Sequence, residues 1–373
     1  MNQFSITPEN YQDQLDTKMA RLTQQLAVIN QDSLPDIEVF ESPKTHYRMR
    51  AEFKVWHEGD KTHYAMSDKE TKKPVFITDF AVAAKNINTL MPLLMAEINH
   101  CEILRKKLFQ IEFLTTLSHD MLVTFIYHRP LSEVWVERAS IIKEKFAINI
   151  TGRSRKQKMV LGRDHVNEEL KVNDNTYLYQ QNEGSFTQPN AQVCEKMLSW
   201  AVNNSRPSDE KNKCDLLELY CGNGNFTLPL AQNFHRVIAT EIAKSSVNSA
   251  QENIRLNNID NVTILRMSSE DFADAMDKVR PFRRLKEIDL DSYNFSTVLV
   301  DPPRAGLDDH TLGVIQQFDT IIYVSCNPAT LVDNLQKLYI THNITSLAAF
   351  DQFPYTDHLE AAVILKKKFF RKN

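Results

Sequence analysis

The stretch KCDLLELYCGNGNF (residues 213–226) decides the fold, because a run of apolar residues passes directly into a turn with two glycines. The chain has only eight glycines, and Gly222 and Gly224 are two of them. Glycine adopts the left-handed backbone that a tight strand-to-helix turn needs, and it lets a ligand approach the main chain. The segment therefore predicts a β-strand whose carboxyl end lies at a ligand-binding edge of a sheet.

Further apolar segments follow, separated by stretches of helical length. They are 235–242, 262–267, 297–304 and 320–326. Strands that alternate with helices predict right-handed crossovers and a mostly parallel sheet, as in a Rossmann-like α/β domain. Helices are expected at 228–234 and 245–257, and 363–370 is expected to add a closing edge strand.

The first half of the chain has a different pattern. Residues 9–30 repeat apolar side chains at helical spacing: Leu15, Met19, Leu22, Leu26 and Ile29. Residues 46–56 alternate apolar and charged side chains, which predicts a half-buried strand, and EGD (58–60) predicts its hairpin turn.

Helices are then expected at 87–108 and 132–147, with two strands between them at 109–128. This mixture predicts an α+β domain at residues 1–180, followed by the Rossmann-like domain at 181–373.

Composition narrows the class of protein. The 373 residues leave room for two domains, and the formal charge of −4 argues against a uniformly basic surface. The polar N-terminus and the lack of a long apolar run predict no secretory signal and no membrane span. Five cysteines without a CxxC pair disfavour disulfides and structural zinc, so a cytoplasmic protein is expected.

Basic residues gather in the segments 105–107, 153–163 and 366–373. Such clusters are commonly solvated faces, but several together are also consistent with a surface that faces phosphates. Composition leaves both interpretations open.

An acidic residue ends the second strand of the Rossmann-like half. Glu241 follows Gly224 by one strand and one helix, and a carboxylate there typically accepts hydrogen bonds from ribose hydroxyls. The dinucleotide fingerprint needs a third glycine, and Phe226 and Thr227 stand near that place. A nicotinamide cofactor is therefore disfavoured, while a purely structural turn remains the alternative.

Three more residues end or begin strands of the same predicted sheet. Asp301 precedes two prolines in VLVDPPRAG, Cys326 ends TIIYVSC, and Glu360 begins an apolar run. Each has an ordinary structural interpretation: a strand-ending turn, a packed thiol and a surface carboxylate. At a ligand-binding edge, however, a thiol whose pKa falls below its free value of ~8.5 becomes a nucleophile. A buried carboxyl becomes a usable base.

Together these motifs resemble those of the RNA uracil-C5 methyltransferases that use S-adenosylmethionine, and most of all their tRNA-modifying members. The matching pieces are SFTQPN (185–190), ELYCGNGNF (218–226), ATEI (239–242), VDPPRAGL (300–307), YVSCNP (323–328) and FDQFPYTDHLE (350–360). HYRMRAEF (46–53) and KLFQIEFLTT (107–116) extend the resemblance over nearly the whole chain.

The resemblance implies roles for the single residues. Cys326 would be the nucleophile that attacks uracil C6, and Glu360 the base that removes the C5 proton. Gln188, Tyr220, Asn225, Glu241 and Asp301 match the positions that bind S-adenosylmethionine. Asp301 is also a candidate for contact with the uracil edge. No metal is required.

The resemblance also predicts the substrate. Relatives that modify ribosomal RNA carry a four-cysteine iron–sulfur cluster, and here the only cysteine before residue 194 is Cys101. The expected substrate is therefore tRNA, methylated at position 54 of the T-loop to 5-methyluridine, with tRNA-like hairpins such as that of tmRNA as further candidates. The first domain would hold the T-arm, with Arg48, Arg50 and Phe109 as candidate contacts, while the base leaves its stack.

Other functions remain open at this point. An amino-group methyltransferase would use the Asp-Pro-Pro corner, but it usually has an aromatic residue where Arg304 stands, and it needs no thiol. An RNA-binding or RNA-folding module is a second class, and a nicotinamide oxidoreductase a third. No obligate protein partner is evident.

Overall fold

A computed structural model of the chain describes residues 6–29, 34–68, 70–207, 209, 211 and 213–368. Within these residues the chain forms two compact units. Unit 1 comprises Met1–Glu9, Pro43–Leu170 and Tyr179–Ala191, and unit 2 comprises Asn10–Ser42, Lys171–Leu178 and Gln192–Asn373. The units therefore do not correspond to two continuous halves of the sequence.

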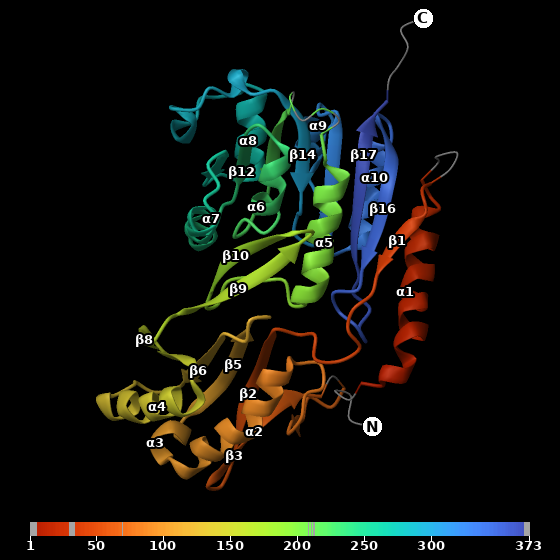
Figure 1. Ribbon diagram of the computed structural model, residues 1–373. Helices are drawn as coiled ribbons and strands as arrows, with labels where there is room; N and C mark the ends of the chain where they lie inside the picture. Colours follow the sequence, from red (N-terminus) through yellow and green to blue (C-terminus); the bar gives the residue numbers. More distant parts are fainter. Residues whose placement is uncertain are drawn as a thin grey trace, which may run out of the picture. The chain divides into compact units, whose positions relative to one another are not determined.

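The elements of unit 2 alternate helix and strand (Figure 1). They are α1 (Tyr11–Leu26), β1 (Ile37–Phe40), α5 (Ala191–Asn204), β11 (Asp215–Leu219), α6 (Thr227–Leu230), η2 (Ala231–Asn233), β12 (Val237–Thr240), α7 (Lys244–Leu256), β13 (Val262–Leu265), α8 (Ser269–Met276), η3 (Arg283–Leu285), η4 (Leu290–Ser292), β14 (Phe295–Val300), α9 (Asp309–Ile315), β15 (Thr320–Ser325), α10 (Pro328–Leu338), β16 (His342–Phe350) and β17 (Glu360–Lys367).

The strands of unit 2 form one sheet, which has eight members among the described residues, in the order β1-β16-β17-β15-β14-β11-β12-β13. Neighbours from β15 to β13 run parallel, while β17 runs antiparallel to both β15 and β16. The chain goes outward from β11 to β13 and then crosses back to β14. That reversal of strand order marks the place where ligands bind in open α/β sheets. The mostly parallel Rossmann-like sheet is thus confirmed.

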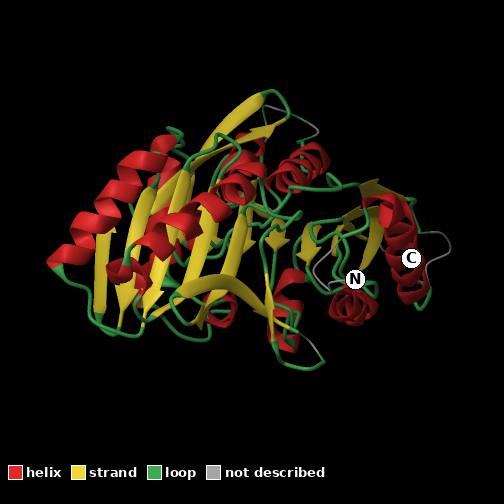
Figure 2. Ribbon diagram, turned by 90° about the horizontal axis from the view of Figure 1, so that it is seen from below, coloured by secondary structure: helices red, strands yellow, loops and turns green. Residues whose placement is uncertain are grey.

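An apolar cluster covers one face of this sheet. It joins side chains of α1, α8, α9 and α10 to side chains of the central strands, and fully buried examples are Ile238, Val298, Ile321, Leu335 and Val363. The strands are apolar on both faces, which explains their near-continuous apolar sequences. Figure 2 shows the helices in red against the yellow strands.

Two expectations about this sheet were wrong. The C-terminal strand was expected at an edge, but β17 lies inside the sheet, because β16 and β1 add two more strands beyond it. The N-terminal segment was expected in the first domain, but α1 and β1 pack within unit 2. Ile37 of β1 pairs in parallel with Leu347 of β16, and Leu22 and Leu26 of α1 belong to the apolar cluster.

Unit 1 contains the α+β elements of the first half. They are η1 (Pro8–Asn10), β2 (Arg50–Glu58), β3 (Lys61–Ser67), β4 (Pro74–Phe76), α2 (Lys85–His100), α3 (Glu102–Arg105), β5 (Leu108–Thr115), β6 (Met121–Tyr127), α4 (Glu133–Phe146), β7 (Asn149–Ser154) and β8 (Gln157–Leu161). Two further strands, β9 (His165–Val172) and β10 (Asn175–Asn182), pair with each other and contribute residues to both units.

The sheet of unit 1 has the order β4-β3-β2-β5-β6-β7-β8. The alternation predicted for 46–56 is confirmed, since Tyr47, Met49 and Phe53 are buried while Glu52 and Lys54 are exposed. Helix α2 packs against β3 and β5, and α4 packs against β7 and β8. Gly152 permits the second contact, because a Cβ there would lie 2.3 Å from the Trp135 ring.

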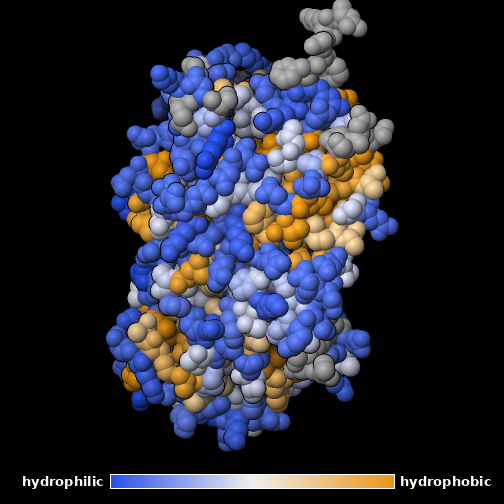
Figure 3. Space-filling view, turned by 45° about the vertical axis from the view of Figure 1, so that its right-hand side comes forward, coloured by the Kyte–Doolittle hydropathy of each residue, from blue (hydrophilic) through white to orange (hydrophobic). Residues whose placement is uncertain are grey.

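Exposed apolar side chains are distributed in separate groups. On the face shown in Figure 3, blue hydrophilic residues dominate and orange hydrophobic residues form several patches.

Of the predicted basic clusters, 105–107 and 153–163 lie in unit 1. The end of the third, from residue 369 on, lies outside the described residues.

A buried ion pair fixes α1 to the segment that leads into β17. Lys18 Nζ lies 2.6 Å from Asp351 Oδ1, with side-chain exposures of 4% and 0%. The same ammonium donates to the Phe353 carbonyl at 2.9 Å, and Gln14 Nε2 donates to Asp351 Oδ2 at 3.2 Å. Each charge is therefore neutralised and hydrogen-bonded, which burial demands.

We expect Lys18→Met to lower the free energy of unfolding by ~3–5 kcal/mol, because it leaves the Asp351 carboxylate buried without its cation. Urea denaturation measures the change. The matched control is Lys278→Met, whose ion pair with Asp291 is exposed on both sides and should change stability by less than about 0.5 kcal/mol. Equal effects of the two substitutions would contradict the assignment of Lys18 as a buried anchor.

Candidate active site

The carboxyl ends of three parallel strands, β11, β12 and β14, bring three of the predicted cofactor residues to one edge of the sheet. Leu219 of β11 pairs with Thr240 of β12 and with Val300 of β14. Asp301, Tyr220 and Glu241 directly follow the paired residues Val300, Leu219 and Thr240. They therefore lie side by side at this edge, in the order β14, β11, β12. Tyr220 has a left-handed backbone (φ 64°), and its hydroxyl accepts a hydrogen bond from Ser269 Oγ at 2.5 Å.

The glycine turn is built around the Glu241 carboxylate. Its oxygens accept hydrogen bonds from the backbone N–H of Gly222 (3.1 Å) and of Ala243 (2.7 Å). Gly222 has φ 57°, and a Cβ built on it would meet no atom within 4 Å. Open space beside a left-handed glycine is what a ligand that approaches the main chain requires.

The Asp-Pro-Pro segment is anchored to α10. Asn334 Oδ1 accepts hydrogen bonds from the backbone N–H of Leu307 (3.0 Å) and from the Tyr323 hydroxyl (2.6 Å). Gly306 has φ 77°, and a Cβ there would lie 3.0 Å from the same oxygen. The Arg304 carbonyl accepts from Asn327 Nδ2 at 2.9 Å. These contacts hold the segment that follows Asp301 beside the segment that follows Cys326.

Cys326 and Glu360 meet because β15 and β17 are antiparallel. Ser325 pairs with Ala361, and Cys326 and Glu360 are the next residues of the two strands beyond that pair. Glu360 is also paired with Phe350 of β16, and only 5% of it is exposed. The structure therefore brings together the predicted nucleophile and the predicted base, which are far apart in the sequence.

Burial raises the pKa of the Cys326 thiol to about 11, and the negative charges of Glu360 and Asp301 add to the shift. Arg304 acts in the opposite direction. The condition stated for a nucleophilic thiol, a pKa below its free value, is not met in this state. Without bound ligands, Cys326 is a thiol at neutral pH rather than a thiolate.

The acidic residues near Cys326 are also shifted. Burial raises the pKa of Glu360 to about 8, and Asp301 contributes in the same direction while Arg304 opposes it. Burial raises the pKa of Asp301 to about 7. These carboxyls hold protons more strongly than exposed ones do, because a low-dielectric environment disfavours the charged form.

The sequence interpretation missed Glu218, which lies on β11 two residues before Tyr220. It is 1% exposed, and its Oε2 has no hydrogen-bond partner among the described residues. Burial raises its pKa to about 8, and Asp301 adds to the shift. A charged residue within the otherwise apolar run LLEL (216–219) was the available signal.

The interpretation also missed Arg304 as an electrostatic partner of the thiol. Arg304 Nη2 lies 3.4 Å from His358 Nδ1, and burial together with Arg304 lowers the pKa of His358. A neutral imidazole thus accepts from the guanidinium. Asn225, another predicted cofactor residue, accepts through Oδ1 from Cys194 Sγ at 3.5 Å.

The remaining predicted residues belong to unit 1. Gln188 is half-buried there. Arg48 Nε donates to the Arg50 carbonyl, and Arg50 Nη2 donates to the Ser185 carbonyl at 2.8 Å. Phe109 is 36% exposed and stacks on His128, with 4.2 Å between ring centroids. Their predicted contacts with cofactor and RNA stay predictions.

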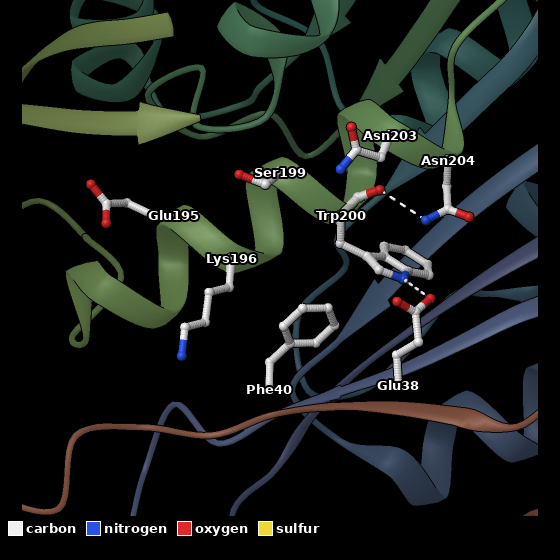
Figure 4. A pocket seen from close by; sticks show the side chains of 8 residues that line it. All are labelled: Glu38, Phe40, Glu195, Lys196, Ser199, Trp200, Asn203 and Asn204. Carbon is white, nitrogen blue, oxygen red and sulfur yellow. Dashed lines mark hydrogen bonds between the residues drawn. The ribbon is translucent and has the colours of Figure 1, made fainter. Parts of the chain in front are cut away.

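A cavity of about 310 Å³ lies between α5 and β1 (Figure 4). Trp200 Nε1 donates to Glu38 Oε1 at 2.9 Å, and Asn204 Nδ2 donates to the Trp200 carbonyl at 3.0 Å. These bonds attach the edge strand to α5, and none of the predicted site residues lines this cavity. Its polar groups serve the fold.

Among the described residues, no group of three or more histidine, cysteine or acidic side chains is arranged to hold a metal ion. No helix within the described ranges is long and apolar enough to cross a membrane.

Comparison with known proteins identifies the family. The family model described as tRNA (Uracil-5-)-methyltransferase matches residues 10–368. The chain belongs to this family. It is therefore a methyltransferase, and its motifs at the sheet edge are those of an RNA uracil-C5 methyltransferase, as the sequence predicted.

Similar proteins match over nearly their full lengths. A tRNA/tmRNA (uracil-C(5))-methyltransferase of Cellvibrio japonicus (strain Ueda107) is 56% identical over 358 residues, with 96% of each chain covered. One of Vibrio parahaemolyticus serotype O3:K6 is 53% identical over 375 residues, with 99% of this chain and all of the relative covered.

A solved structure shares the fold. It is the Pyrococcus abyssi tRNA (uracil-54, C5)-methyltransferase in complex with S-adenosyl-L-homocysteine, with a TM-score of 0.72 and 21% identity. The match covers 95% of this chain and 83% of that one. The shared fold therefore includes both units of this chain.

We expect alkylation of Cys326 by iodoacetamide in the ligand-free protein to show an inflection near pH 11, because burial and two carboxylates oppose the thiolate. Glu360→Gln should move the inflection to lower pH. Glu360, with a pKa of about 8, is already ionised where the thiol titrates, so its removal eliminates a repelling charge.

Mass spectrometry of the Cys326 peptide measures this rate separately from the other cysteines, and exposed Glu270 offers a control as Glu270→Gln. An inflection near or below pH 8.5 in the unmodified protein would contradict the half-buried, acid-flanked thiol.

Proposed function

We propose that this protein methylates uracil C5 in the T-loop of tRNA, at position 54, through a covalent adduct of Cys326. The observation that carries the proposal is the antiparallel register that sets Cys326 beside Glu360 at the ligand-binding edge of the sheet. Family membership supports the reaction type, and the names of the relatives support tRNA and tmRNA as substrates.

The methyl donor is S-adenosylmethionine, which supplies a methyl group on a positively charged sulfur. The edge beside Tyr220, Glu241 and Asp301 fits this molecule, because it offers carboxylates and an open left-handed glycine turn. Glu218 adds an unpartnered buried carboxyl oxygen. A cation bound at this edge would favour the ionised forms of Glu218 and Asp301, whose pKa values burial raises. Glu241 is expected to accept from ribose hydroxyls.

Cys326 activates the uracil. Its thiolate adds to C6, and the electron pair of the C5–C6 double bond moves to give an enolate with a nucleophilic C5. That carbon then accepts the methyl group. The resting thiol must first lose its proton, and Arg304 favours the thiolate. A further positive charge held at the edge would act in the same direction.

Glu360 completes the reaction. C5 carries both the methyl group and its original proton after transfer, and the Glu360 carboxylate removes that proton. The electrons of the C5–H bond re-form the C5–C6 double bond and expel the Cys326 thiolate. Protonated Glu360 then returns its proton to solvent. A base in a nearly buried site has a raised pKa, which makes it stronger once it is ionised.

Unit 1 is proposed to hold the RNA. Phe109 is an exposed aromatic ring with a stacked imidazole, and unpaired bases of RNA commonly stack on such rings. Arg48 and Arg50 are half-buried and bonded to backbone carbonyls. In this arrangement each guanidinium retains further N–H donors for phosphates or bases. Uracil must leave its stack for Cys326 to reach C6.

The decisive test uses tRNA with 5-fluorouridine in the T-loop. Fluorine cannot leave as a proton, so the elimination fails and the protein should stay covalently attached through Cys326, stable to denaturing electrophoresis. Cys326→Ala should form no adduct while still binding tRNA. Wild-type protein that methylates tRNA but never forms the adduct would overturn the covalent mechanism.

We expect Glu360→Gln to accumulate the adduct with ordinary tRNA, because methyl transfer proceeds while proton removal is slowed by about 10²–10⁴-fold. Denaturing gels and single-turnover kinetics measure both steps. Glu360→Gln protein that releases product at the wild-type rate would exclude Glu360 as the proton acceptor.

The pH profile provides an independent check. Because the raised pKa of Glu360 is about 8, its carboxylate fraction increases as pH rises through that value. Because proton removal follows methyl transfer, kcat should increase from about pH 6 to about pH 9, and Glu360→Gln should remove this inflection. A wild-type profile that is flat over this range would contradict the assignment.

A further inference from the structure

The open face of the unit 1 sheet carries a row of aromatic rings at one end. On β2, Glu52, Lys54 and Trp56 alternate with the buried residues and so point away from α2 and α4. Trp56 is paired directly with His63 of β3. The His63 ring stacks on Phe76 of β4, with 4.6 Å between centroids and an angle of 12°. Three neighbouring strands thus contribute one ring each.

These rings are not covered by the described chain. Trp56 is 47% exposed and Phe76 is 40% exposed. Large aromatic side chains bury 150–250 Å² when they pack, so leaving two of them in water loses stabilisation. A row of this kind on a sheet face is typical of a surface that binds flat ligands.

The row is continuous with the predicted RNA contact. Lys54 of β2 pairs with Gln110 of β5, and the strands are antiparallel, so Trp56 and Phe109 both lie beyond this pair at the same end of the sheet. A register shift between Leu108 and Gln110 occurs at Phe109. Phe109 then stacks on His128, the residue that directly follows β6. Aromatic rings therefore occur on β4, β3, β2 and β5 and just beyond the end of β6.

The charges next to the row favour an anionic ligand. Lys54, Lys61 and Lys107 are exposed and form no ion pair with any described residue. Two of the acidic residues nearby are engaged: Glu58 lies 3.8 Å from His63 Nε2, and Asp60 pairs with Arg105. Glu52 and Glu112, which are paired with each other across β2 and β5, lie further along the sheet from Trp56 than Lys54 does. Lysines that flank exposed rings are the pattern of single-stranded nucleic-acid binding, in which bases stack and phosphates meet cations.

We propose that Trp56, His63 and Phe76 form a stacking platform for a second unpaired base of the RNA substrate, separate from the uracil that is methylated. Lys54 and Lys61 contact its phosphates. The proposal rests on the proposed function, since it takes the substrate to be RNA. Unpaired nucleotides fit this platform and paired ones do not, because a base inside a helix offers no free face.

The chain contains its own reporter for this contact. It has three tryptophans, and Trp135 and Trp200 are 0% and 3% exposed. Acrylamide quenching of intrinsic fluorescence therefore reports on Trp56. Saturating unmodified tRNA transcript should lower the quenching constant several-fold, and stacking should reduce the emission itself. N-acetyltryptophanamide in the same solutions corrects for absorption by the RNA.

Substitutions test whether the aromatic faces matter. Trp56→Leu and Phe76→Leu should each weaken tRNA binding by about 5- to 100-fold, while Trp56→Phe, which keeps a ring, should retain most of the affinity. KM for tRNA should rise while kcat at saturating tRNA stays unchanged, because the platform does not touch the reacting base. Val160→Ala, at an exposed site on β8, is the matched control and should change neither.

The outcomes separate this inference from the proposed function. Wild-type protein that methylates tRNA while Trp56 stays fully open to quencher would overturn the platform alone. Protection of Trp56 that appears on raising the protein concentration without RNA would also overturn it, in favour of self-association. Failure of the wild-type protein to methylate tRNA would instead remove the proposed function.

Discussion

The antiparallel insertion of β17 between β15 and β16 is the constraint on which the site depends. A parallel strand at that place would begin at the opposite edge of the sheet, and six paired residues at ~3.3 Å each would separate Glu360 from Cys326 by about 20 Å. Because β17 runs the other way, its first residue meets the end of β15. Strand β17 thus places the Glu360 carboxyl at the edge of the sheet where the parallel strands end.

The same apolar surroundings that stabilise the sheet determine the resting protonation of the site. Burial raises the pKa of Glu218, Asp301, Glu360 and Cys326 together. The ligand-free site is therefore poor in charge at neutral pH, and a resting thiol is less reactive toward oxidants and alkylating agents than a thiolate. A nucleophile kept as a thiol until its ligands arrive avoids such side reactions.

Local sequence patterns predicted the elements better than their order in space. The strand at 46–56, the hairpin at 58–60 and the helix at 132–147 were recognised because burial of one face leaves a period in the sequence. The position of β17 within the sheet was not predicted, because an apolar sequence is compatible with an edge strand and with an interior strand. The pairing of β1 with β16 was also missed: IEVF is too short for a clear pattern, and its partner lies at the far end of the chain. The positions of Asp301, Cys326 and Glu360 at strand ends could be predicted from the sequence. The raised pKa of the Cys326 thiol could not, because it depends on Glu360 and Asp301, which only the strand register brings close.

Pairing between the two ends of the sequence affects how the protein is made. Unit 1 consists mainly of one continuous stretch, Pro43–Leu170, so the ribosome delivers it whole while unit 2 is still incomplete. Helix α1 and strand β1 emerge before this stretch, yet their partners in β16 and the 351–358 segment emerge after it. During that interval the apolar face of α1, with Leu15, Leu22 and Leu26, has no sheet to cover it, and such surfaces attract chaperones or other nascent chains. Helix α1 and strand β1 therefore cannot reach their final packing until the later strands of unit 2 have been synthesised.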